Sequence, residues 1–150
     1  MRGLATPLTM TDTLGVPPPK GGFQHLETTM KKKTLAALGE KLIRQGFADP
    51  ASFKLAKGFQ SIHQDGARDR EQERQTLSNL NLKDITLANF KVTRRENLLI
   101  LTYTAAGQET IDGQSTSTEP AYRLSVFIQA GKDWELLAHA NLLPMTKTQA

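Results

Sequence analysis

Two polar side chains stand out in an apolar run near the end of the chain. After Glu135, the segment ELLAHANLLP (residues 135–144) contains only His139 and Asn141 as polar residues. In a β-strand, residues two positions apart point to the same face, so these two side chains are expected to lie together. An imidazole can exchange a proton near neutral pH, and an amide both donates and accepts hydrogen bonds. The spacing predicts a local polar site on one face of a strand.

The preceding predicted strand, AYRLSVFIQ (121–129), supplies the side chains that neighbour His139 and Asn141 across the hairpin. One register across the hairpin separates polar from apolar side chains, whereas a shift by one residue mixes them. We therefore expect the separating register, with one mixed face and one aliphatic face. The pairs that it predicts are Phe127–Leu137, Ser125–His139 and Arg123–Asn141. The aliphatic face would contain Leu124, Val126, Ile128, Trp134, Leu136, Ala138 and Ala140.

Two interpretations of the mixed face stay open. If the aliphatic face packs against helices, the mixed face is the outer one and can meet a second subunit. The interface would then contain Arg123, Ser125, Phe127, Leu137, His139 and Asn141. In the other arrangement the mixed face points inward and its polar groups line a ligand pocket.

Composition excludes several classes of protein. The chain has 150 residues, enough for one domain with its own core, and it contains no cysteine, which excludes disulfides and thiolate sites. The formal charge of +4 is spread along the chain, so we expect no nucleic-acid partner. His25, His63 and His139 form no close pair, so we expect no metal site. No membrane-spanning run or secretory signal is evident, which favours a cytoplasmic location.

Hydrophobic periodicity changes from helical to strand-like along the chain. Apolar spacing predicts helices at 34–46, from Asp49-Pro50 to about Gly58, and at 69–80, where Asp69 and Gln72 have capping-box spacing. The charged run RDREQERQ in the third helix is expected to be solvated. Alternating patterns predict strands at 59–63, 84–92, 98–106, 121–129 and 134–142. Helices followed by a meander of strands indicate an α+β domain with an antiparallel sheet.

Residues 1–29 differ in composition from the rest of the chain. This segment is rich in Thr, Pro and Gly and includes GVPPPKGG at 15–22. Consecutive prolines favour an extended chain and glycines add freedom. We therefore expect a flexible extension at 1–29 and a folded domain at 30–150.

The last hairpin carries a family resemblance. The segment RLSVFIQAGKDWELLAHANLLP (123–144), together with LLILTYTA (98–105), resembles SnoaL-like members of the nuclear transport factor 2-like superfamily. The resemblance implies a cone-like curved antiparallel sheet with three N-terminal helices on its concave face, enclosing a pocket. It also implies a homodimer. The superfamily includes isomerases, cyclases, dehydratases and oligomerisation modules, so the fold alone assigns no chemistry.

Isomerase-type chemistry in this superfamily needs a carboxylate base in an apolar pocket. The acidic residues here lie mostly in predicted turns, caps and exposed helix faces, and none is centred in a strand between apolar neighbours. The sequence therefore offers no convincing catalytic acid or base.

We expect a protein that binds an unknown small molecule in the cone, with no cofactor. The candidate contacts are Phe59, His63, Tyr103, Ser125, His139 and Asn141. His63 alternatively stabilises the turn at Asp65-Gly66, and Tyr103 alternatively packs in the core. An isomerase, cyclase or hydrolase and a dimerisation module remain the alternative functions. A buried carboxylate facing the cavity favours an enzyme, and a filled cone favours the interaction module.

Overall fold

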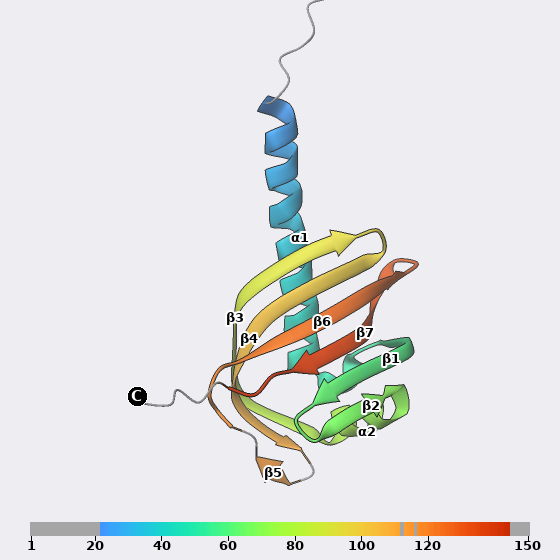
Figure 1. The fold of residues 1–150 in the computed structure, drawn as a ribbon, viewed down its shortest axis with the longest axis vertical. Helices are drawn as coiled ribbons and strands as arrows, with labels where there is room; N and C mark the ends of the chain where they lie inside the picture. The colour runs from blue at the N-terminus through green and yellow to red at the C-terminus, as the bar shows by residue number, and fades with distance from the viewer. Residues whose placement is uncertain (1–21, 112, 116, 145–150) are drawn as a thin grey trace, which may run out of the picture.

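The computed structural model describes residues 22–111, 113–115 and 117–144, with side chains from residue 31 onward (Figure 1). Two α-helices, one short 3₁₀-helix and seven strands make up this part of the chain. The helices are α1 (Gly22–Ala48), η1 (Pro50–Ser52) and α2 (Arg70–Asn79). The strands are β1 (Leu55–His63), β2 (Gly66–Asp69), β3 (Leu80–Arg95), β4 (Leu98–Ile111), β5 (Gln114–Ser115), β6 (Ala121–Ala130) and β7 (Asp133–Asn141).

The strands form one curved sheet that does not close on itself (Figure 1). Its order is β2-β1-β7-β6-β4-β3, with β5 paired to β4. The predicted α+β class is confirmed, but the sheet is not purely antiparallel, because β1 and β7 run parallel. These two strands are distant in sequence, so no tight hairpin forces them to be antiparallel.

The expectation of three helices is wrong. The segment from Asp49 forms only the three-residue turn η1, and Leu55 already belongs to β1. Leu55 is buried opposite Leu136, and the Leu136 amide donates to the Lys54 carbonyl at 2.7 Å. Pairing with β7 therefore outweighs the helical pattern that the sequence suggested.

The first helix is longer than the range 34–46 predicted from its apolar spacing. No proline or glycine interrupts residues 23–38, so the chain is free to be helical from Gly22. Residues 22–29 belong to this helix, while residues 1–21 of the predicted extension lie outside the described residues. Gly46 does not end the helix. A Cβ there would lie 1.7 Å from the Phe53 ring, so the glycine permits close packing.

The other predicted elements are confirmed with shifted ends. Helix α2 begins at the predicted capping box, in which Asp69 Oδ1 accepts from the Gln72 amide and the Gln72 side chain accepts from the Asp69 amide. Strands β3 and β4 are longer than predicted. None of the helices in the described ranges is long and apolar enough to cross a membrane.

Two irregularities in β3 bend the sheet. The pairing of β3 with β4 shifts register between Lys83 and Thr86 and again between Ala88 and Lys91. Asp84 and Asn89 have positive φ angles of 52° and 57° at these places. Bulges of this kind increase twist and curvature. Figure 1 shows β3 and β4 bending sharply, so that the sheet wraps around a concave face.

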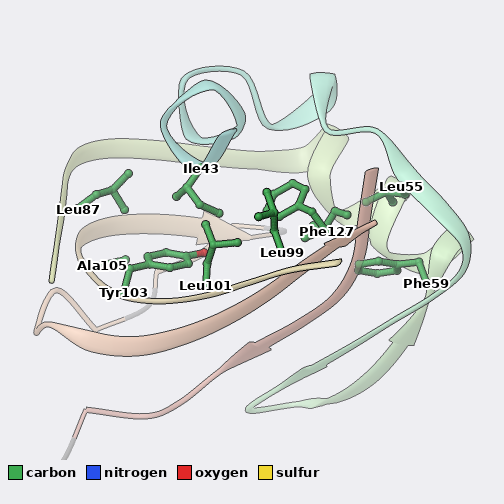
Figure 2. Packing of buried hydrophobic residues seen from close by; sticks show 10 residues of the cluster. Ile43, Leu55, Phe59, Leu87, Leu99, Leu101, Tyr103, Ala105 and Phe127 are labelled. Carbon is green, nitrogen blue, oxygen red and sulfur yellow. The ribbon is translucent and has the colours of Figure 1, made fainter. Parts of the chain in front are cut away.

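The hydrophobic core fills this concave face beneath α1 (Figure 2). Ile43 of α1 is packed against side chains from β1, β3, β4, β6 and β7. The buried members are Ile43, Leu55, Phe59, Leu87, Leu99, Leu101, Tyr103, Ala105, Phe127 and Leu136. Tyr103 stacks on Phe90, with ring centroids 5.4 Å apart. The core therefore extends along the concave face from β1 to β3.

The predicted hairpin register holds at one end only. Ser125 lies opposite His139 and Arg123 opposite Asn141, as predicted. Phe127, however, lies opposite Leu136, because a register shift leaves Leu137 as an extra residue. This bulge brings Leu136 onto the same face as His139.

The prediction that the aliphatic face packs against the helices is wrong for β6, although Trp134 and Leu136 of β7 do pack into the core. On β6, Ser125 and Phe127 are 1% and 2% exposed, whereas Leu124 is 39% exposed on the convex face. The mixed face of β6 therefore points inward. The polar side chains on this face have partners inside the protein: Arg123 pairs with Glu109, and Ser125 contacts Tyr103 and His139.

Candidate functional site

A cavity lies between the concave face of the sheet and the ends of the helices. It offers about 60 Å³ to the centre of a water-sized molecule, which is enough for more than one water. A wider and more polar hollow of about 630 Å³ adjoins it and forms its vestibule. The two spaces share His63, Arg68, Thr76, Glu109, Ile111, Arg123 and Asn141.

One wall of the cavity is apolar. It is formed by the end of α1, the segment after η1, α2 and the neighbouring strands. Its members are Phe47, Phe53, Leu77, Leu80, Leu82, Ile111 and Leu136. The polar wall comes from β1, β2, β4, β6, β7 and α2. Its members are His63, Arg68, Glu73, Tyr103, Glu109, Arg123, Ser125, His139 and Asn141.

A chain of three hydrogen-bonded side chains crosses β4, β6 and β7. The Tyr103 hydroxyl lies 3.0 Å from Ser125 Oγ, which in turn lies 3.0 Å from His139 Nδ1. Burial raises the pKa of Tyr103, so the phenol keeps its proton. Burial, Arg123 and His63 lower the pKa of His139 from 6.5 to about 3. His139 is thus a neutral imidazole near pH 7.

A second group of hydrogen bonds surrounds a buried carboxylate on α2. Ser61 Oγ donates to Glu73 Oε2 at 2.9 Å, and His63 Nε2 lies 3.2 Å from the same oxygen. Asn141 Nδ2 lies 3.1 Å from His63 Nδ1, so the two side chains are within hydrogen-bonding distance. Burial alone would raise the pKa of Glu73, but His63, Ser61 and His139 hold it below its usual value.

Two guanidinium groups reach the cavity and are only partly paired. Arg123 forms an ion pair with Glu109 and lies over the Phe47 ring, 5.2 Å from its centroid. Arg68 donates through Nη2 to both oxygens of Asp65, at 3.0 and 2.9 Å. Within the described part of the chain, no hydrogen-bond partner is found for the buried atoms Arg68 Nη1, Arg123 Nε and Asn141 Oδ1.

The structure brings most of the sequence candidates together. His63, Tyr103, Ser125, His139 and Asn141 all line the cavity. Phe59 does not, since it is buried in the core at 2% exposure. Contact of the cavity residues with a ligand remains a prediction.

The dimer interpretation put its interface residues on the outer face of the sheet, and most of them do not lie there. Arg123, Ser125 and Phe127 alternate along β6 on the concave face, and His139 and Asn141 lie opposite on β7. These side chains point into the protein, away from any partner that docks on the convex face. Leu137 is the extra residue of the bulge and is half-buried.

Sequence reasoning missed Arg68, Glu73 and Glu109. The run RDREQERQ was interpreted as solvated, but Glu73 is only 4% exposed. Its spacing to Leu77 and Leu80, four and seven residues on, is the helical signal that places it on the inner face. Glu109 lies six residues after Tyr103 on β4, and this even spacing puts both on one face once the strand continues past Gly107.

This arrangement suits binding through hydrogen bonds more than proton transfer. Glu73 is held ionised by its donors and is therefore a weak base, and His139 is hard to protonate. Across the described residues, no three His, Asp or Glu side chains form a group that could hold a metal ion. The free groups are two cationic donors and one amide acceptor.

Comparison with known proteins identifies the fold. No family model and no curated protein matches the sequence. Among solved structures, a nuclear transport factor 2-like protein of unknown function in nutrient uptake from Rhodospirillum rubrum is 17% identical, with a TM-score of 0.61, and the match covers 73% of this chain and 98% of that one. A nuclear transport factor 2-like superfamily protein from Salmonella enterica is 14% identical, with a TM-score of 0.55 and coverage of 81% and 96%.

A third similar structure is a nuclear transport factor 2-like protein from Cytophaga hutchinsonii. It is 10% identical, with a TM-score of 0.53, and the match covers 81% of this chain and 97% of that one. The chain therefore has the nuclear transport factor 2-like fold, as its last hairpin suggested. At these identities the likeness concerns the fold and assigns no activity.

The depressed pKa of His139 predicts a pH-dependent stability. Because the folded value of about 3 lies below 6.5, protons bind more tightly to the unfolded chain at this residue. The contribution of His139 to the free energy of unfolding is complete above pH 6.5. It is lost as pH falls toward 3, at up to about 1.4 kcal/mol per pH unit. Urea unfolding of the wild type and of His139→Gln should show a stability difference that shrinks, or reverses in favour of the variant, on acidification. Parallel curves for the two proteins would contradict this assignment.

Proposed function

We propose that the protein binds a small molecule in the cavity between the helices and the sheet, as a SnoaL-like binding protein. The observation that carries the proposal is the set of buried polar atoms without partners on the cavity wall, from Arg68, Arg123 and Asn141. A buried donor or acceptor that is left unpaired is costly, so a bound molecule that pairs with it gains affinity. The apolar residues of the lining supply the burial that binding of an organic molecule needs.

Buried carboxylates at the cavity were the expected sign of an isomerase, cyclase or hydrolase. Glu73 and Glu109 meet that description, yet each is already engaged. Glu109 pairs with Arg123, and Glu73 accepts from Ser61 and His63. A general base near neutral pH needs a raised carboxylate pKa, whereas that of Glu73 is lowered. These contacts support binding ahead of acid–base catalysis.

Blocking the cavity tests this proposal. Thr76 of α2 borders both the inner cavity and the vestibule, so Thr76→Trp should fill the entrance. Its neighbour Gln75 is exposed, so Gln75→Trp is the matched control. In a fragment screen by ligand-observed NMR, the wild type and Gln75→Trp should bind the same fragments, and Thr76→Trp should lose them. Absence of any binding to the wild type, or equal binding to all three proteins, would refute the proposal.

We also propose that the convex face of the sheet joins two copies of the chain. Several large apolar side chains are exposed there, including Ile62 and Tyr122 at 58% each. Ile62, Ala140 and Leu124 lie in one row across β1, β7 and β6, which makes the patch continuous. Contiguous apolar surface of this kind is typical of protein interfaces. An exposed and largely apolar sheet face also suits a self-complementary contact.

A charge placed in this patch should separate the subunits. Leu124→Arg would bury an unpaired cation in the contact, so the variant should sediment as a monomer at micromolar concentration while the wild type is a dimer. Lys132→Glu in the exposed turn between β6 and β7 controls for the change of charge and should remain dimeric. A monomeric wild type, or a Leu124→Arg variant that stays dimeric, would contradict the interface.

A further inference from the structure

We propose that the cavity selects an uncharged amide, whose carbonyl oxygen accepts from the free guanidinium N–H groups and whose N–H donates to Asn141. This inference rests on the proposed function and adds the chemical class of the ligand. Its basis is the set of unpaired atoms, the balance of charge around them and the apolar wall.

The unpaired atoms define the hydrogen bonds that a ligand can complete. Arg123 Nε and Arg68 Nη1 are donors, and Asn141 Oδ1 is an acceptor. Arg123 and Asn141 are direct partners across β6 and β7, so one small group can reach both. An amide offers a carbonyl acceptor and an N–H donor about 2.3 Å apart, as fixed by its planar geometry. It therefore matches this pair.

Arg68 lies at the same end of the cavity. Its Nη1 is 3.8 Å from Glu73 Oε2, an oxygen that already has hydrogen-bond contacts with Ser61 and His63. His63 in turn contacts Asn141 through Nδ1. Arg68 is thus connected to Asn141 through Glu73 and His63. Its Nη1 can donate a hydrogen bond to the second lone pair of the ligand oxygen.

The charges around the cavity are already balanced. Arg68 and Arg123 supply two positive charges, and Glu73 and Glu109 supply two negative charges on the same wall. His139 is neutral near pH 7, and Asp65 and Glu119 add negative charge at the vestibule. Among the residues that the structure describes, no lysine borders either space. A carboxylate ligand would add a buried charge without a counter-ion, and a cation would face two guanidinium groups.

The apolar wall determines which chemical groups suit the rest of the ligand, beyond its amide. Phe53, Leu77, Leu80, Leu82 and Ile111 come from α2 and its surroundings and offer no hydrogen bonds from their side chains. A short hydrocarbon chain on the amide can lie against them, and each buried methylene contributes about 0.8 kcal/mol, a factor of about four in affinity. The affinity of simple amides should therefore rise with chain length until the inner cavity is full.

Isosteric probes test the class of ligand directly. Acetamide, propionamide and butyramide are to be compared with the carboxylates and amidinium ions of equal chain length, by NMR titration of the full chain. At each length we expect the amide to bind at least about tenfold more tightly than either ion, because a hydrogen bond or charge mismatch in a buried site is worth this much. Equal or tighter binding of a carboxylate or an amidinium ion would overturn the proposal.

A substitution at Arg68 gives a second measurement. Its main partner Asp65 has a side chain that is 73% exposed, so Arg68→Met should fold. The variant should bind butyramide about tenfold more weakly and favour the amidinium ion, since it leaves Glu73 with one cation fewer. Arg74→Met, in which an exposed arginine of α2 is replaced, is the matched control and should bind like the wild type. Unchanged amide binding in Arg68→Met would overturn the role of its donor.

The outcomes also separate this inference from the proposed function. If no amide binds but other fragments do, and Thr76→Trp abolishes their binding, the amide class is wrong and the cavity remains a binding site. If neither the amides nor any fragment bind to the wild type, both proposals fail.

Discussion

The inward-facing polar groups of the sheet must find partners inside the protein, and this requirement shapes the whole site. Arg123 and Glu109 meet on neighbouring parts of β6 and β4, and Glu73 reaches Ser61 and His63 from α2. Removing one member of such a buried pair leaves an uncompensated charge, which costs far more than the pair contributes. The position of α2 over the sheet is therefore tied to the polar wall as well as to the apolar core.

Curvature of the sheet makes this arrangement possible. The two irregularities in β3 and the bulge at Leu137 bend the strands around a concave face. At its centre, Leu99, Leu101 and Phe127 are buried against α1, whereas the end near α2 stays open as a cavity. One face of one sheet thus holds both a packed core and a polar binding wall, and the convex face is left with aliphatic side chains.

Local sequence signals predicted β1, β3, β4, β6 and β7, the capping box at Asp69 and the pairing of Ser125 with His139, but not the short strands β2 and β5. They could not predict the bulge at Leu137, because a bulge depends on which side chains need burial across the hairpin. They also assigned the aliphatic face to the core on hydrophobicity alone. Glu109 was missed because its ion-pair partner, Arg123, belongs to another strand, and such pairing is visible only in three dimensions. The expectation of a short helix after Asp49 is wrong for a related reason, because Leu55 pairs with Leu136 of β7 and so belongs to the sheet.

A high-resolution crystal structure of the protein would test the central claim, that polar side chains of the concave face border an open cavity. The account predicts clear density for the Tyr103–Ser125–His139 chain and for Glu73 with His63. It also predicts water or ligand density between these groups and the wall of Leu77 and Phe53. A map in which those apolar side chains fill the space, or in which Arg68 and Arg123 point out to bulk solvent, would contradict it.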